Sequence, residues 1–325
     1  MRHLMNYYMP NIQKYVIRIL WMVPIYSIQS WLSLRFHDSS LYIETLRDFY
    51  ESYVLASFLY YLVELLGGED NIKALLARKT NNYGAHPPFL RCLLAEWEGD
   101  EFLLQCKYGV LQYVVIKIIL SALTVCLELG GVYDFGSMRF DRGYVYVSFF
   151  GNLSQMWALY VLVKLYFATE SDMKSPVNWR PVGKFMCVKG VVFFTFWQGT
   201  FIAALQNGGV IKPIGSWAAD DVATGIQDYL ICVEMLFFAV AHSYTFSYAE
   251  YMTLVSGGDD ALVANDSYGF VTASYPQAST VREAFWNSTV PTEITDDIKH
   301  LARGPRNYEK SKKMANPNQT LVESV

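Results

Sequence analysis

Polar residues recur at helical spacing inside one long apolar stretch of the sequence. Lys117, Ser121, Thr124 and Glu128 lie at positions i, i+4, i+7 and i+11 of the segment 109–130. On a helix of 3.6 residues per turn, these positions fall within about 60° of one another. They therefore form one polar stripe, with a cation at one end and a carboxylate at the other. The stripe either lines a path for polar groups or joins two helices by hydrogen bonds, and the sequence leaves both readings open.

A second apolar stretch, 226–246, carries ionisable residues along its length. Asp228 lies near its start, Glu234 near its centre and His242 beyond the centre. The stretch is about long enough to cross the ~30 Å hydrocarbon core of a membrane. A carboxylate at mid-membrane costs roughly 2.5–3.5 kcal/mol, so such residues usually face a protein interior or a water-filled cavity. We therefore expect Glu234 to face inward.

Lys117 and Glu234 have opposite charges and similar expected depths in the membrane. We hypothesise that they face each other, or that they share a substrate or a proton; a purely structural ion pair is the alternative. Asn152 lies at a similar depth. Gln198 offers a polar group for binding, with ordinary packing as the alternative. His242 is either a proton relay or, as we favour, an interior histidine satisfied by a neighbour.

The composition indicates which elements must position these residues. Hydrophobic residues make up 53% of the 325 residues, charged residues 17% and aromatic residues 16%, and the mean hydropathy is +0.17. Such values are typical of a membrane protein with interfacial belts of Trp and Tyr. Six apolar segments recur, at about 16–34, 49–66, 109–130, 144–167, 185–206 and 226–248.

We therefore predict an all-α fold: a polytopic helical transmembrane bundle of six spans in residues 1–250. Pro24 is expected to kink the first span. Residues 251–325 are polar and are expected to form a mostly disordered cytosolic tail, with a short helix near 292–302. Arg18, Glu64, Lys164 and Lys189 lie within a few residues of the predicted cytosolic surface, where long cationic side chains usually extend to the lipid headgroups.

The distribution of basic residues predicts the orientation of the spans. With the six segments above, 17 of the 26 Lys and Arg residues fall on one side of the membrane and 5 on the other. Because cytosolic loops are enriched in Lys and Arg, both ends of this chain are expected to be cytosolic.

The sequence lacks the motifs of the common enzyme classes. It has no HExxH, no GxSxG, no P-loop and no glycine-rich dinucleotide turn. Its five cysteines show no spacing suited to zinc or to a redox pair. The net charge of −4 gives no reason to expect a nucleic-acid partner. We therefore predict a protein that is not an enzyme and that uses no cofactor and no metal.

Several stretches, taken in their order and spacing, resemble one membrane-protein family. They are Ile17–Tyr26, Tyr50–Tyr53, Lys107–Tyr113, Val182–Phe185 with Phe196–Gln198, and Glu234–Tyr248. Together they are similar to the organic solute transporter alpha and transmembrane protein 184 family. The resemblance implies seven helices with an outside N-terminus, so the first helix is expected to be missing from this chain. In the family, the position of Lys117 tends to be basic and that of Glu234 acidic.

The resemblance also implies a function. The better-known members of the family move steroid-like organic anions by facilitated diffusion, together with a small single-span partner subunit; other members are described as receptors or as endomembrane proteins. By this resemblance we expect transport of amphipathic organic solutes in a plasma membrane or an endomembrane such as the vacuole. Lys117 would attract an anionic head group, and a homo-oligomer is the alternative to a partner subunit. The other functions to be weighed are a seven-helix-type receptor and a trafficking scaffold.

The predicted orientation makes a direct prediction about glycosylation. The acceptor sequons at Asn265, Asn287 and Asn318 all lie in the tail that we expect to be cytosolic. They should therefore carry no glycan when the chain is expressed in eukaryotic cells. The measurement is the electrophoretic mobility of the protein before and after treatment with an endoglycosidase, and a glycan on any of the three would overturn the orientation.

Overall fold

The protein is described here by a computed structural model, in which the described residues are 2–36, 39–79, 83–87, 90–91, 96–97, 99–133, 140–173, 181–215, 217–251 and 280–302. Within these ranges the regular elements are all helices, and a single isolated bridge joins Ile214 and Trp217. The predicted all-α fold is therefore confirmed. The helices are α1 (Arg2–Met5), α2 (Pro10–Leu20), α3 (Met22–Arg35), α4 (Ser40–Leu65), α5 (Glu69–Ala77), α6 (Gly99–Leu129), α7 (Gly143–Met173), α8 (Pro181–Asn207), α9 (Ala219–Thr245), α12 (Val281–Thr289) and α13 (Thr292–Ala302).

Each of the six apolar segments lies on long helical structure. The first falls on the pair α2 and α3, and the others on α4, α6, α7, α8 and α9. Among the described residues, three helical stretches are long and apolar enough to cross a membrane: Glu101–Leu129, Val182–Gln206 and Ala219–Tyr251. The protein is an integral multi-pass membrane protein, and the count of six spans stays a prediction.

The first segment is broken where a proline was expected to kink it. Helix α2 ends at Leu20 and α3 begins at Met22, with Trp21 between them. Pro24 lies in the first turn of α3, where a helix tolerates a residue without a backbone N–H. The ring also leaves the carbonyl of Leu20 without its usual i+4 donor, which explains why the helix divides at this point.

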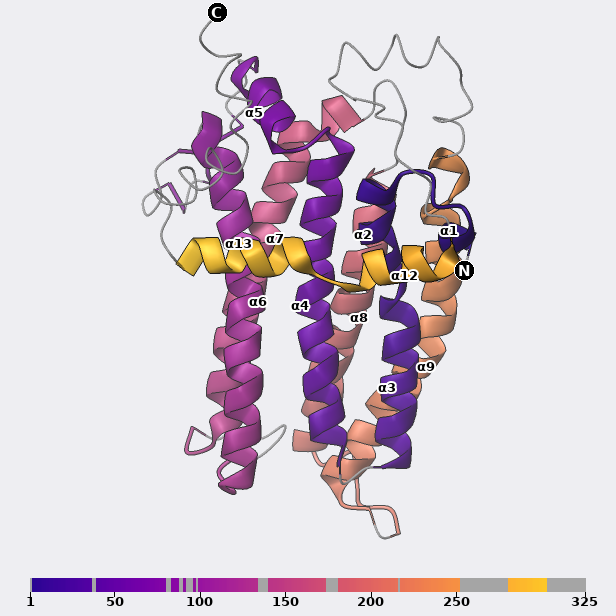
Figure 1. The fold of residues 1–325 in the computed structure, drawn as a ribbon. Helices are drawn as coiled ribbons and strands as arrows, with labels where there is room; N and C mark the ends of the chain where they lie inside the picture. The colour runs from indigo at the N-terminus through magenta and orange to yellow at the C-terminus, as the bar shows by residue number, and fades with distance from the viewer. Residues whose placement is uncertain are drawn as a thin grey trace, which may run out of the picture. The chain divides into compact units, whose positions relative to one another are not determined.

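Helix α4 lies at the centre of the bundle. It packs against α2, α3 and α6, and α6 in turn packs against α7 (Figure 1). Helix α9 packs against α3 and α8. Residues 54–63 of α4 are buried on every face of the helix, as expected of a helix surrounded by protein. Large aromatic side chains such as Phe58 and Tyr61 fill this half of the bundle.

Helices α8 and α9 present aromatic and aliphatic side chains outward. Phe193, Trp197 and Phe201 of α8, and Leu236 and Phe237 of α9, are all more than half exposed. In a protein that crosses a membrane, such a surface is suited to contact with lipid.

Two cations near span ends are buried instead of extending to headgroups. Arg18 is 2% exposed, its Nε donates to the carbonyl of Ser288 at 2.7 Å, and its guanidinium lies over the ring of Tyr15. Lys164 is 8% exposed, and its Nζ donates to the carbonyl of Gly84 at 2.7 Å. The expectation of headgroup contact was therefore wrong, because neighbouring segments cover both side chains.

The chain divides into two units, Met1–Ser288 and Thr289–Val325. In the first unit, Phe285 of α12 makes an edge-to-face contact with Trp21, and Ala284 is buried with Tyr7 and Ile17. In the second unit, α13 matches the short helix expected near 292–302. Residues 281–289 of the tail that was expected to be mostly disordered form α12, and residues 252–279 and 303–325 lie outside the described part of the chain.

Helix α1 is held to the end of α9 by a buried histidine. Nε2 of His3 lies 2.9 Å from the carbonyl oxygen of Phe246, and Nδ1 lies 3.5 Å from Nε2 of Gln13. Burial of the ring lowers the pKa of His3 below its ordinary value, and the nearby charge of Lys184 acts in the same direction. The geometry suits a neutral ring whose Nε2 donates and whose Nδ1 accepts.

This histidine makes the stability of the protein depend on pH. Because the pKa is depressed in the folded state, the neutral ring contributes stability that is present above the unfolded pKa of about 6.5 and is lost as the pH falls through the folded pKa. We expect the melting temperature in detergent to fall more between pH 7.5 and 5.5 for the wild type than for His3→Gln. Equal decreases in the two proteins would exclude His3 as the source.

Candidate functional site

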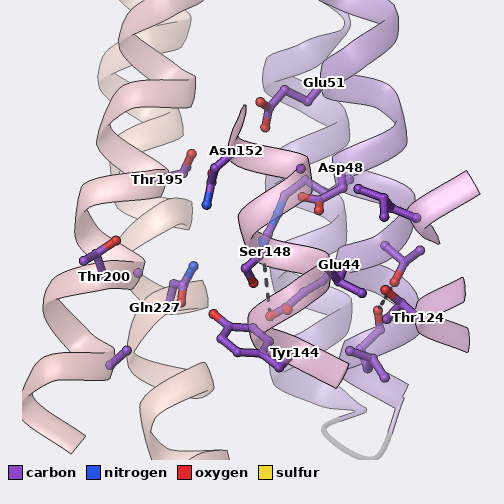
Figure 2. A pocket seen from close by; sticks show the side chains of 18 of the residues that line it. Glu44, Asp48, Glu51, Thr124, Tyr144, Ser148, Asn152, Thr195, Thr200 and Gln227 are labelled. Carbon is purple, nitrogen blue, oxygen red and sulfur yellow. Dashed lines mark hydrogen bonds and ion pairs between the residues drawn. The ribbon is translucent and has the colours of Figure 1, made fainter. Parts of the chain in front are cut away.

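A cavity of about 460 Å³ lies between α4, α6, α7, α8 and α9 (Figure 2). Most of its polar lining consists of hydroxyl and carboxamide groups. They belong to Thr45, Ser121, Thr124, Ser148, Asn152, Gln155, Thr195, Thr200, Gln206, Thr224 and Gln227, with the tyrosines Tyr26, Tyr133 and Tyr144. Aliphatic side chains such as Leu120, Val147 and Val192 complete the wall. The cavity therefore offers both polar and apolar surface.

Helix α4 brings three carboxylates to this cavity. Glu44, Asp48 and Glu51 lie at positions i, i+4 and i+7, which places them on one face of the helix. All three line the cavity, and Figure 2 shows them stacked along α4. Arg47 also contributes to the lining, at its edge toward α3 and α9.

Asp48 and Lys117 form an ion pair across the wall of the cavity. Nζ of Lys117 donates to Oδ2 of Asp48 at 2.7 Å. The side chain of Asp48 is 48% exposed, whereas that of Lys117 is 15% exposed. The carboxylate of Asp48 lines the cavity and is therefore open to its interior.

Glu51 is held by three neutral donors from three different helices. Its Oε1 accepts hydrogen bonds from the hydroxyl of Tyr113 at 3.2 Å and from Nε2 of Gln155 at 2.5 Å. Its Oε2 accepts from the hydroxyl of Tyr26 at 3.4 Å. Since these donors belong to α6, α7 and α3, this one carboxylate fixes the mutual positions of four helices.

A buried ion pair joins α4 to α9 beside the cavity. Nη1 of Arg47 lies 3.2 Å from Oδ1 of Asp228 and 3.5 Å from the hydroxyl of Ser30. The side chains of Arg47 and Asp228 are 9% and 1% exposed. Glu44 lies 3.9 Å from the same guanidinium. Asp228, noted in the sequence only for its place in an apolar stretch, is thus the partner of a cation on α4.

The structure places four of the eight candidate residues at the cavity. Lys117, Ser121, Thr124 and Asn152 line it; Glu128, Gln198, Glu234 and His242 are not part of the described lining. Glu128 is exposed near the end of α6. His242 is buried, and its Nδ1 lies 2.8 Å from the carbonyl oxygen of Phe238.

The hypothesis that Lys117 faces Glu234 is not what the structure shows. Lys117 pairs with Asp48, and Oε1 of Glu234 accepts a hydrogen bond from Nε2 of Gln198 at 3.1 Å. The expected depths of the two residues were similar, but depth does not determine how a helix is rotated about its axis. Rotation decides which neighbour a side chain meets, and here it turns Glu234 toward α8.

The sequence did not identify Glu44, Asp48 and Glu51 as site residues; Glu51 was noted only as lying near the outer end of its span, where it could be solvated. The spacing that identified the stripe on segment 109–130 is also present in these three residues. It was overlooked because two of them precede the apolar segment 49–66, whereas the helix itself begins at Ser40. A search for helical spacing that extended beyond the apolar segment would have found them.

Comparison with known proteins adds independent information. Residues 1–251, which include every residue of the cavity lining, match the family described as "Organic solute transporter Ostalpha". The chain is 37% identical over 264 residues to Protein LAZ1 homolog 1 of Arabidopsis thaliana, covering 77% of this chain and 53% of that protein. The chain thus spans about half the length of this curated relative. No solved structure matches it.

The ion pair between Arg47 and Asp228 predicts a large effect on stability. Asp228→Asn leaves a buried guanidinium without its nearest carboxylate, which typically costs about 3–5 kcal/mol. We expect a clear fall in the melting temperature of the protein in detergent. The double variant Arg47→Met with Asp228→Asn should recover part of the loss, because it removes the unpaired charge.

The matched control removes an exposed ion pair. Lys299 and Asp296 are 67% and 60% exposed, and exposed pairs contribute about 0–1 kcal/mol. Lys299→Met should therefore leave the melting temperature nearly unchanged. If Asp228→Asn has the same melting temperature as the wild type, the pair does not stabilise the contact between α4 and α9.

Proposed function

Because the chain belongs to the organic solute transporter Ostalpha family, we propose that it moves amphipathic organic solutes across a membrane and that the cavity is part of their path. The coarser part of this proposal, membrane transport of solutes, is what the family match supports. The finer part concerns the path and the type of solute, and the lining of the cavity supports it.

The observation that carries the proposal is the open carboxylate of Asp48 beside Lys117. Charged residues inside membrane-spanning segments usually face a water-filled cavity or a substrate path. Here an ion pair, two further carboxylates and a ring of hydroxyl and amide groups all face the same space. Packing alone does not require such a concentration of polar groups around an open volume.

The size and the mixed lining of the cavity suit an amphipathic solute. A volume of about 460 Å³ lies within the range of about 300–1,000 Å³ that is typical of small-molecule sites. Hydroxyl and amide groups would hold the polar part of the solute, and the aliphatic wall would hold its apolar body. The transport is proposed to be facilitative, as the family resemblance implies.

The ion pair of Lys117 bears on the charge of the solute. The family resemblance implied steroid-like organic anions, with Lys117 attracting the anionic head group. In the structure, the ammonium group of Lys117 is already paired with Asp48, so it provides no free positive charge. Lys117 therefore gives no support for an anionic solute.

A receptor is the alternative function. The same cavity would then hold a ligand without releasing it on the other side. The contact of Phe285 of α12 with Trp21 favours this alternative over a scaffold, because it links the segment that follows the bundle to the break between α2 and α3. Solute flux distinguishes the two functions, since only a transporter moves the solute across the membrane.

The proposed path predicts that bulk inside the cavity stops transport. Ser148 of α7 lines the cavity, whereas Leu153 of the same helix is 57% exposed and is not part of the described lining. In proteoliposomes, Ser148→Trp should lower the uptake of a labelled steroid by about tenfold or more, which corresponds to at least ~1.4 kcal/mol. Leu153→Trp should leave uptake unchanged.

Two outcomes would contradict this prediction. Wild-type uptake by correctly folded Ser148→Trp would exclude the cavity as the path. If the folded wild type bound a steroid in detergent but moved none in proteoliposomes, the receptor would replace the transporter as the leading function.

A further inference from the structure

We propose that the cavity takes a solute whose polar end carries a positive charge, with the cation lying beside Asp48 and Glu51. This inference rests on the proposed function, since it names the class of solute that uses the same cavity. It differs from the anionic class that the family resemblance implied, and it is argued from the charges that line the cavity.

The charges in and behind the cavity wall do not balance. Three carboxylates line it, those of Glu44, Asp48 and Glu51, and Asp228 lies behind Arg47. In the described lining, the cationic side chains are those of Arg47 and Lys117. Charges removed from bulk water are strongly disfavoured unless they are compensated. The excess of carboxylates therefore favours a positively charged occupant.

Both cations of the lining are already engaged. Arg47 is held between Asp228 at 3.2 Å and Glu44 at 3.9 Å. Lys117 donates to Asp48 at 2.7 Å. An anionic head group would have to displace one of these carboxylates and would then lie close to it. Like charges at this separation repel each other strongly in a medium of low dielectric constant.

Glu51 provides an independent reason to expect a cation. Its two oxygens accept hydrogen bonds from Tyr26, Tyr113 and Gln155, all of which are neutral donors. No ion pair involving Glu51 is formed within the described part of the chain. Hydrogen bonds orient this carboxylate without cancelling its charge, so it can still interact favourably with an incoming cation.

Glu44 provides a second carboxylate, one oxygen of which can still accept a hydrogen bond. Its side chain is only 11% exposed, and its Oε1 accepts no hydrogen bond from the described residues. The distance of 3.9 Å to Arg47 is too long for a hydrogen bond. A buried carboxylate oxygen normally has a donor, and an ammonium head group in the cavity would supply one.

The aromatic lining favours an organic cation over a metal ion. Tyr26, Tyr133 and Tyr144 all contribute to the wall, and aromatic rings attract organic cations within about 6 Å of the ring centre. Within the described ranges, no three His, Cys, Asp or Glu residues are grouped in a way that would hold a metal ion. The volume of the cavity also exceeds what a bare ion needs.

The test compares three solutes that share one apolar body. A labelled steroid nucleus carries a trimethylammonium, a hydroxyl or a sulfate group, and uptake of each is measured in proteoliposomes at zero membrane potential. Binding of each probe in detergent is followed by its effect on the melting temperature. For the wild type, we expect the ammonium probe to enter about tenfold faster than the sulfate probe, and to raise the melting temperature more.

Two substitutions should shift this preference in opposite directions. Glu51→Gln keeps an oxygen that accepts hydrogen bonds but removes the negative charge, so the ratio of ammonium to sulfate uptake should fall by about tenfold. Lys117→Gln removes a positive charge, so the same ratio should rise. A general disturbance of the fold would not change the ratio of ammonium to sulfate uptake in opposite directions in the two variants. The control is Glu128→Gln, which lies outside the described lining and should leave the ratio unchanged.

The outcomes separate this inference from the proposed function. Faster uptake of the sulfate probe by the wild type would overturn the positive charge while leaving the transporter intact. A ratio that Glu51→Gln does not change would also overturn it, since Glu51 would then be neutralised by a proton. If the folded protein neither binds nor moves any of the three probes, both the inference and the proposed function fail.

Discussion

The cost of keeping charge away from water is the constraint on which the rest of this structure depends. The first half of α4 carries Glu44, Arg47, Asp48 and Glu51, and none of these groups is stable in hydrocarbon without compensation. Compensation comes from all sides: from α9 through Asp228, from α6 through Lys117, and from tyrosine and glutamine side chains on α3, α6 and α7. A helix whose charged groups require partners on several other helices has to lie at the centre of the bundle.

The two halves of α4 divide the bundle into an open end and a closed end. Every residue of the described cavity lining belongs to the end at which α4 begins. Toward the other end, residues 54–63 of α4 are buried, and Phe58 and Tyr61 pack against Phe185 and Phe246. Polar groups that need water or partners prevent close packing in one half, whereas aromatic rings fill the other.

The helices could be predicted well from the sequence, because segments that are buried or face lipid consist mostly of apolar residues. All six apolar segments lie on helices, and the break near Pro24 follows from the chemistry of proline. Half of the candidate site residues reach the cavity. Helical spacing places Lys117, Ser121 and Thr124 on one inward face of α6, whereas Asn152 was singled out by its expected depth. The partner of Lys117 could not be predicted from the sequence, because the rotation of each helix about its axis is set by packing against residues far away in the sequence.

Glu51 and Glu234 differ in their surroundings, and this difference decides which of the two borders the cavity. Both are carboxylates inside helices of the bundle, and position along the helix does not distinguish them. Three donors from three helices converge on Glu51, and an open volume lies next to it. Glu234 meets one amide, that of Gln198, on the neighbouring helix, and it lies outside the described lining. A single pair of polar groups joins two helices, as polar residues often do in membranes. Donors from three helices converge on Glu51 at the border of an open volume, and this arrangement supports the proposal that the cavity is part of the solute path.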